Sequence, residues 1–153
     1  HMFQDFFYSP IGIVYIQAND QAIFDIGIID KEVDTIPNHL TAICKTQLLE
    51  YFAGSRTSFS LPLQLQGTAF EQAIYQTLRT IIFGTTISYG ELAKKAGYPR
   101  AARAVGSAMQ KNKLMLVVPC HRVLAAKNHL GGFAISLEKK KWLLHHENSS
   151  FKE

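Results

Sequence analysis

Apolar, β-branched and aromatic residues dominate two short segments near the start of the chain. GIVYIQA, residues 12–18, and AIFDIGII, residues 22–29, have the composition of β-strands, and Asn-Asp-Gln at 19–21 supplies a turn between them. The pattern predicts a β-meander over residues 6–29. SFSLPL, residues 58–63, is predicted to add one more strand.

The hydrophobic period becomes that of a helix between Pro37 and Phe52. Gly54 follows this segment and is its expected C-terminal cap. Cys44 lies inside the apolar stripe, so its expected role is core packing. The apolar positions of the stripe are Leu40, Ile43, Cys44, Leu48, Tyr51 and Phe52.

Two capping boxes mark helix starts in the second part of the chain. Thr68 and Glu71 form the first, and Ser88 and Glu91 form the second, ahead of the short helix YGELAKKA. A last helix is predicted over residues 137–147. This part of the chain is therefore expected to be mainly helical.

A helix-turn-helix is predicted where the second of these helices ends. Gly97 should stop that helix, and Pro99 is well placed as the first residue of the next, PRAARAVGSAMQ, residues 99–110. Two helices joined by a tight turn that contains glycine are typical of this motif.

The tripeptide LQG, ending at Gly67, is interpreted as a domain boundary. The fold class predicted is α+β. A small β-meander-plus-helix domain, residues 1–67, is expected to pack on a mainly helical domain with the helix-turn-helix, residues 68–153. His1 and Met2 resemble the remnant of a cloning site, with Met2 as the natural start.

The second helix of the helix-turn-helix has a nearly bare face. Ala101, Ala102 and Gly106 are small, and Arg103 projects from among them. One interpretation is close packing against another helix. The other is a helix that presses into a narrow nucleic-acid groove, where Arg103 enters the base stack and Met109 acts as an apolar wedge.

The stretch VVPCHRVL, residues 117–124, places reactive groups at the end of an apolar run. LMLVV, residues 114–118, is predicted to be a buried strand or core segment, and Pro119 should end it. Cys120 would act as a nucleophile only as a thiolate, so a base must take its proton. His121 is the candidate, directly or through a bridging water.

A histidine base needs a carboxylate to fix its tautomer. The second part of the chain holds five, and four have other expected roles in caps, a solvated helix start or the terminus. Glu147 remains as the candidate. The alternative is a buried, inert cysteine beside a surface histidine.

Composition and charge limit the class of protein and the kind of partner that this chain can have. The chain is 47% hydrophobic and 18% charged, which is typical of a globular protein, and no apolar run approaches a membrane span. Two cysteines form no disulfide framework or zinc site, so an intracellular protein is expected. Residues 1–67 carry three Lys/Arg against seven Asp/Glu, and the remainder thirteen against five. The basic second part suggests contact with a polyanion, or only a solvated basic surface.

Three segments together resemble the O6-alkylguanine-DNA alkyltransferase family. They are ISYGELAKKAGYPRAARAVGSAMQKNKLMLVVPCHRV from residue 87, LGGF from residue 130 and KKWLLHHE from residue 140. The resemblance covers residues 68–147 and is strongest at PCHRV preceded by RAVG. The N-terminal part is similar only through SPIG and the helix with Cys44.

The resemblance implies repair of O6-alkylguanine, with O4-alkylthymine as a second candidate, in double-stranded DNA. The base would be flipped from the minor-groove side and its alkyl group transferred once to Cys120. His121 would deprotonate Cys120 through water, oriented by Glu147. Such a single-turnover methylated-DNA–[protein]-cysteine S-methyltransferase would need no metal or cofactor. It would act as a monomer in the cytoplasm or at the nucleoid, without a membrane.

The resemblance also assigns roles around the acceptor. Tyr89 would help rotate the nucleotide and donate a hydrogen bond to the guanine, and Arg103 would fill the gap. Asn112 would brace the turn around Cys120. The carbonyls of Cys120 and Val123 would contact the guanine amino group.

The loop after PCHRV departs from the family pattern G-Y-x-G-G. Gly132-Phe133-Ala134-Ile135-Ser136 stands there instead. Phe133, Ala134 and Ile135 are expected to line the substrate pocket, so the departure affects pocket size and hydrogen bonding to O6.

Three other functions share single features with this chain. A cysteine protease would use a thiol and imidazole, but nothing else suggests peptide binding. A transcriptional regulator would have the helix-turn-helix but no use for the nucleophile. An alkyltransferase-like protein that binds alkylated lesions without repair lacks the acceptor cysteine, and Cys120 is present.

Overall fold

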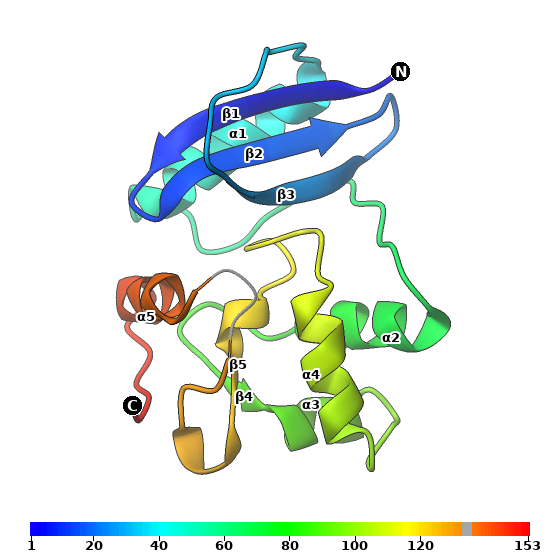
Figure 1. Cartoon of the computed structure of the whole chain (residues 1–153), viewed down its shortest axis with the longest axis vertical. Helices are drawn as coiled ribbons and strands as arrows, with labels where there is room; N and C mark the ends of the chain where they lie inside the picture. Colours follow the sequence, from blue (N-terminus) through cyan, green and yellow to red (C-terminus); the bar gives the residue numbers. More distant parts are fainter. Residues whose placement is uncertain (133–135) are drawn as a thin grey trace. The chain divides into compact units, whose positions relative to one another are not determined.

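The computed structural model describes residues 1–132 and 136–153. They form two compact units (Figure 1). The first comprises His1–Leu65 and Lys113–Met115, and the second comprises Gln66–Asn112 and Leu116–Glu153. Residues 113–115 therefore group with the first unit, although they lie far along the chain from the rest of it.

The first unit contains a three-stranded antiparallel sheet. β1 (Phe3–Ser9), β2 (Gly12–Ala18) and β3 (Ile23–Ile29) lie in the order β1-β2-β3. The predicted meander is confirmed, and its first strand begins at Phe3. Val14 and Ile16, two residues apart on β2, share one face of the sheet and are both fully buried there.

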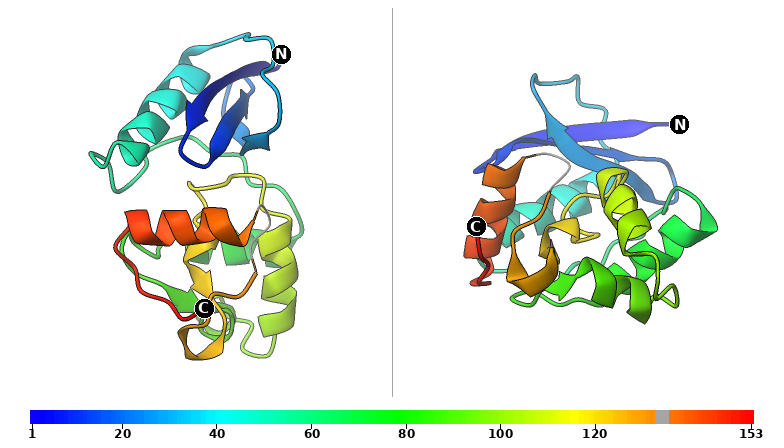
Figure 2. Two further views of the ribbon diagram at one scale, coloured as in Figure 1. Left: turned by 60° about the vertical axis from the view of Figure 1, so that its left-hand side comes forward. Right: turned by 60° about the horizontal axis from the view of Figure 1, so that its bottom comes forward.

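One helix, α1 (His39–Phe52), covers a face of this sheet (Figures 1 and 2). Its N-cap Asn38 forms a reciprocal capping box with Thr41. Gly54 adopts a φ of +86° just after the helix, as its predicted role requires. Cys44 is fully buried among the core side chains, so its predicted packing role is confirmed.

The strand predicted at residues 58–63 is wrong. Leu63 makes only an isolated bridge to Ile23, in which Ile23 N–H donates to the Pro62 carbonyl at 2.8 Å. Pro62 has no N–H group to continue a ladder, so the segment stays irregular.

The apolar run at residues 114–118 is buried but is not a strand. Leu116 has a φ of 74°, which turns the backbone in the middle of the run. The interpretation as a core segment is confirmed, and the strand alternative is excluded.

The second unit is mainly helical, as predicted. Its helices are α2 (Ala69–Leu78), α3 (Tyr89–Lys95), α4 (Ala102–Gln110) and α5 (Leu137–His146). Both predicted capping boxes are present at the starts of α2 and α3. α3 and α4 are neighbours in space, as a helix-turn-helix requires. None of the helices among the described residues is long and apolar enough to span a membrane.

The turn between α3 and α4 corrects one prediction. Pro99 does not start α4, which begins three residues later. Ala101 N–H instead donates to the Tyr98 carbonyl at 3.0 Å, so Pro99 occupies the second position of a tight turn. Proline favours this position because its fixed φ suits the turn.

A small parallel sheet positions the candidate chemistry. β4 (Ile87–Ser88) pairs with β5 (Val123–Leu124), and the 3₁₀ turn η1 (Cys120–Arg122) directly precedes β5. Tyr89 follows β4 immediately. The pairing thus brings the start of α3 to the segment that follows Cys120.

Candidate active site

Cys120 begins the 3₁₀ turn η1 directly after Pro119, and only 6% of its surface is exposed. Burial raises the pKa of its thiol. A hydrogen bond from Asn112 and the charge of Lys140 oppose that effect. The thiol is therefore protonated at neutral pH and needs a base to become a nucleophile.

His121 and Glu147 form a fully buried pair, 2.7 Å apart between Nε2 and Oε2. The predicted partner of His121 is thus in contact with it. Burial alone would raise the pKa of Glu147, but the hydrogen bonds and charges of His121 and Arg122 hold it well below its usual range. Glu147 is therefore a carboxylate at neutral pH.

A carboxylate can only accept hydrogen bonds, which fixes the tautomer of His121. Nε2 carries the proton that is donated to Glu147, and Nδ1 is left as a basic nitrogen. Nδ1 is buried and has no hydrogen-bond partner among the described residues. Burial lowers the pKa of His121, with Glu147 acting against that shift, so the ring is neutral and able to accept a proton.

Arg122 is a member of this network that the sequence did not assign. Its Nε donates to Glu147 Oε1 at 2.8 Å and its Nη2 to Oε2 at 3.1 Å. Nη1 donates to the Ile81 carbonyl at 2.6 Å. The guanidinium thus holds both oxygens of the carboxylate that orients His121.

Asn112 lies where the brace around Cys120 was predicted. Its Nδ2 donates to the Val118 carbonyl at 2.9 Å, two residues before the thiol. The same side chain hydrogen-bonds to Cys120, which lowers the thiol pKa. Asn112 thereby fixes the backbone ahead of the 3₁₀ turn.

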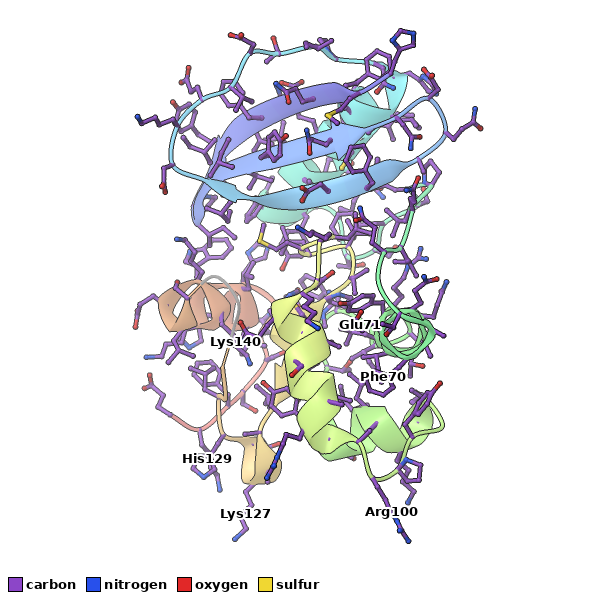
Figure 3. The ribbon with its side chains drawn as sticks, turned by 45° about the vertical axis from the view of Figure 1, so that its right-hand side comes forward. Phe70, Glu71, Arg100, Lys127, His129 and Lys140 are labelled. Carbon is purple, nitrogen blue, oxygen red and sulfur yellow. The ribbon has the colours of Figure 1, made fainter. Side chains whose placement is uncertain are left out.

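Lys140 is a buried cation that sequence reasoning missed (Figure 3). Its Nζ donates to the carbonyls of Val123, at 2.7 Å, and Gly132, at 2.8 Å. Burial lowers its pKa to about 8. Lys140 is three and four residues before Leu143 and Leu144, which are both fully buried, so the three side chains lie on the same buried face of α5. This helical spacing is the sequence feature from which the burial of Lys140 could have been predicted.

A groove of about 590 Å³ lies between the start of α3, the side of α4 and the segment after β5. Tyr89, Arg103 and Gly106 line it, as do Ala102 and Ala125. The predicted small-residue face of α4 is therefore exposed to a groove and not covered by another helix. Ala101, half-buried at the helix N-cap, does not line the groove.

Tyr89 is half-buried at this groove, and burial raises its pKa, against a hydrogen bond from the Gly132 backbone. Its hydroxyl is therefore protonated and able to donate. A Cβ on Gly131 would lie 3.3 Å from that hydroxyl, so the glycine leaves room for it.

The prediction that Met109 is a wedge is wrong. Only 5% of Met109 is exposed, and it lies with Val105 and Ala108 on the buried side of α4. Arg103 is exposed on the other side of the helix. Because helical residues six apart lie on different faces, the two cannot enter one groove together.

Two predicted pocket features have different outcomes. The Val123 carbonyl already accepts a hydrogen bond from Lys140, so only its second lone pair is available to a ligand. Phe133, Ala134 and Ile135 lie outside the described residues.

Within the described residues, no cluster of three His, Cys, Asp or Glu side chains could hold a metal ion.

Comparisons with known proteins agree with this geometry. Residues 69–149 match the family model for the DNA binding domain of 6-O-methylguanine DNA methyltransferase, and residues 2–65 match the model for its ribonuclease-like domain.

Two curated relatives cover most of the chain. A constitutive methylated-DNA--protein-cysteine methyltransferase of Bacillus subtilis (strain 168) is 48% identical over 141 residues, which are 92% of this chain and 84% of that protein. One of Mycobacterium leprae (strain TN), a methylated-DNA--protein-cysteine methyltransferase, is 40% identical over 142 residues, 89% of this chain and 86% of that protein.

Solved structures show the same fold. The crystal structure of Mycobacterium tuberculosis O6-methylguanine methyltransferase superposes with a TM-score of 0.87 at 34% identity, covering 96% of this chain and 93% of that one. The OGT of the same organism, solved in complex with DNA, gives a TM-score of 0.87 at 35% identity, covering 94% and 91%. The chain therefore belongs to the 6-O-methylguanine DNA methyltransferase family.

Proposed function

We propose that this protein repairs O6-alkylguanine in duplex DNA by moving the alkyl group, once, to the sulfur of Cys120. One observation carries the assignment. Cys120 begins a 3₁₀ turn, and the next residue, His121, is held by Glu147 as a neutral imidazole that can accept a proton. Membership of a family whose curated members are named methylated-DNA--protein-cysteine methyltransferases supports the substrate.

The reaction is a displacement at the alkyl carbon. A bond forms between Cys120 Sγ and that carbon while the bond from carbon to O6 breaks. The thiol proton passes to Nδ1 of His121 through a water molecule. The departing guanine anion takes up a proton from solvent, and the imidazolium of His121 returns its proton to solvent. Atoms and charges balance without an oxidant, a metal or an organic co-reactant.

Burial of Cys120 has a consequence for the order of events. Its raised pKa leaves little thiolate at neutral pH, so proton removal accompanies attack. Nδ1 of His121 can accept the proton because Nε2 already donates to Glu147. The imidazolium that forms is stabilised by the Glu147 carboxylate.

The target alkyl group lies inside a stacked duplex, so the base must leave the stack before the thiolate can reach it. The groove beside α4 supports this step, because Arg103 is exposed on its wall and can replace the extruded base. Tyr89 lies in the same groove with a protonated hydroxyl that can donate to the guanine ring.

A lesion-binding protein without repair activity would need the groove but not the network behind it. Here a buried arginine holds a buried carboxylate, and that carboxylate holds the imidazole of His121, the residue after Cys120. Burying three ionisable groups costs desolvation free energy even when they pair, so the network is of little use to the fold alone and is suited to positioning a base. The network therefore favours transfer over binding alone.

The test is intact-protein mass measurement after incubation with excess O6-methylguanine duplex, followed by peptide mapping. One methyl group per chain on Cys120 is expected, and Cys120→Ala should bind duplex without gaining mass. Repeated turnover, or a methyl group on Cys44, would contradict the proposal. Cys44 is a suitable internal control because burial raises its thiol pKa to about 12.

A further inference from the structure

A tight hairpin follows β5, and two of its residues, Ala125 and Ala126, line the groove together with residues of α4. Ala125 N–H donates to the His129 carbonyl at 2.8 Å, and His129 N–H donates to the Ala126 carbonyl at 3.3 Å. Lys127 and Asn128 are therefore the two central residues of the turn.

Both central residues have left-handed backbone, with φ of 60° at Lys127 and 64° at Asn128. This is the geometry of a type I′ turn, where Asn, Asp and Gly are the favoured residues. Asparagine at 128 suits it, but lysine at 127 is strained there. Strained backbone persists where the surroundings enforce it and often marks a functional position.

The C-terminal residues of the chain enforce this geometry. Leu130 N–H donates to the Lys152 carbonyl at 2.8 Å, and Lys152 N–H donates to the Asn128 carbonyl at 2.7 Å. Phe151 packs against the buried cluster that includes Leu130. Residues 128–130, which follow the tip of the turn, are thus held by Lys152.

The tip so held carries a positive charge beside the groove. Ala126, next to Lys127, lines the groove together with Arg103 on α4. Lys127 is exposed and has no ion-pair partner among the described residues. Figure 3 shows Lys127 and Arg100 extending into solvent from the same end of the second unit.

We propose that Lys127 is a DNA-phosphate contact on the hairpin side of the groove, and that Phe151 and Lys152 hold it there. The inference rests on the proposed function, since it requires duplex DNA to lie along the groove. When α4 lies in a groove of the duplex, a DNA backbone passes the rim of the protein groove. A cation whose backbone is already fixed at that rim can neutralise a phosphate without first ordering the turn.

The variant Lys127→Asn separates charge from fold, because asparagine tolerates left-handed backbone. It should be at least as stable as the wild type in thermal unfolding. Its affinity for an unmodified duplex should fall, and the slope of log affinity against log salt should become shallower by about 0.9, the loss of one phosphate contact. Lys127→Arg should retain the wild-type slope.

Asn128→Gly is the matched control, because it relaxes the neighbouring left-handed position without changing charge. It should leave the salt slope unchanged. Phe151→Ala should weaken duplex binding by freeing the tip, and the double variant with Lys127→Asn should bind no more weakly than Lys127→Asn alone, as expected of residues that act through each other.

Each outcome assigns the result to one of the two proposals. A wild type that never gains a methyl group on Cys120 overturns the proposed function. A wild type that is methylated while Lys127→Asn keeps the wild-type affinity and salt slope overturns only the phosphate contact. Additive losses in the double variant would show that the C-terminal residues do not act through Lys127.

Discussion

At the residue scale, the site combines a thiol that burial makes less acidic with an imidazole that burial makes less basic. Both shifts favour neutral side chains in the resting protein. A thiol and imidazole that are both neutral react by transferring a proton during attack, so Cys120 and His121 work as a pair. This differs from a cysteine that is already a thiolate before substrate arrives.

The pH dependence of transfer follows from these directions. Because the pKa of His121 is lowered, the rate should hold from about pH 9 down to pH 6.5, the usual histidine pKa, and fall only below it. His121→Ala should slow transfer at pH 7 by roughly 10²-fold, and its rate should rise with pH as hydroxide replaces the base. Single-turnover rates on methylated duplex check this.

A wild-type rate that climbs about tenfold per pH unit between pH 7 and pH 9 would contradict the base mechanism. It would show that only the preformed Cys120 thiolate reacts. Circular dichroism of both proteins over the same range controls for unfolding.

Arg122 changes how the role of Glu147 must be tested. Glu147→Gln alone leaves a buried guanidinium without its carboxylate, which costs about 3–5 kcal/mol of stability. Lost activity could then reflect lost fold. In the double variant Arg122→Met/Glu147→Gln, both charges are absent, and replacing a buried ion pair by neutral groups is often neutral for stability.

The double variant is therefore expected to regain the stability that Glu147→Gln loses, measured by urea unfolding, while transfer remains slow because His121 still lacks its carboxylate. Recovery of the rate together with the stability would show that Glu147 serves only the fold. Arg122→Met alone is the reference for the unpaired carboxylate.

At the element scale, local chemistry in the sequence predicted helix starts well and long-range pairing poorly. Thr68 with Glu71 and Ser88 with Glu91 form the predicted boxes, because every atom involved lies within four residues. Pro99 could equally begin a helix or fill a turn, and the choice depends on how α3 and α4 pack. Such a choice is not encoded in the neighbouring residues.

The residues of the candidate site could likewise be predicted only in part. Cys120, His121 and Glu147 were found from their chemistry and from the family resemblance, and the last two are in contact. Lys140 was given no role, because its partners are backbone carbonyls in other segments. Every residue has a backbone carbonyl, so the amino-acid sequence does not indicate which carbonyls accept a hydrogen bond from a lysine.

The small residues of α4 give a prediction for that helix. Gly106 lines the groove and a Cβ there would meet no atom within 4 Å, so Gly106→Leu should fold normally while filling the groove. Duplex binding should fall by tenfold or more, since the helix could no longer approach DNA closely. Ala104→Leu, exposed on the same helix but outside the groove, should bind as the wild type does. Equal effects would refute the proposed docking face.

At the scale of the whole molecule, the two units have separate cores, and the acceptor belongs to only one of them. The single tryptophan, Trp142, lies on α5 in that same unit. Its fluorescence therefore reports the unfolding of the second unit, while far-ultraviolet circular dichroism reports both. This separation allows the consequence of alkylation to be localised.

Methylation of Cys120 should destabilise the second unit. The thiol is 6% exposed, and an added methyl group in a packed interior typically costs about 1–3 kcal/mol. For a unit of this size the Trp142 transition should drop by at least ~4 °C. Cys120→Ala treated with the same methylated duplex should show no shift, because it gains no methyl group. A methylated protein that melts at or above the temperature of the unmodified one would mean that the pocket has room for the alkyl group beside Cys120, and that the resting structure is already shaped for its product.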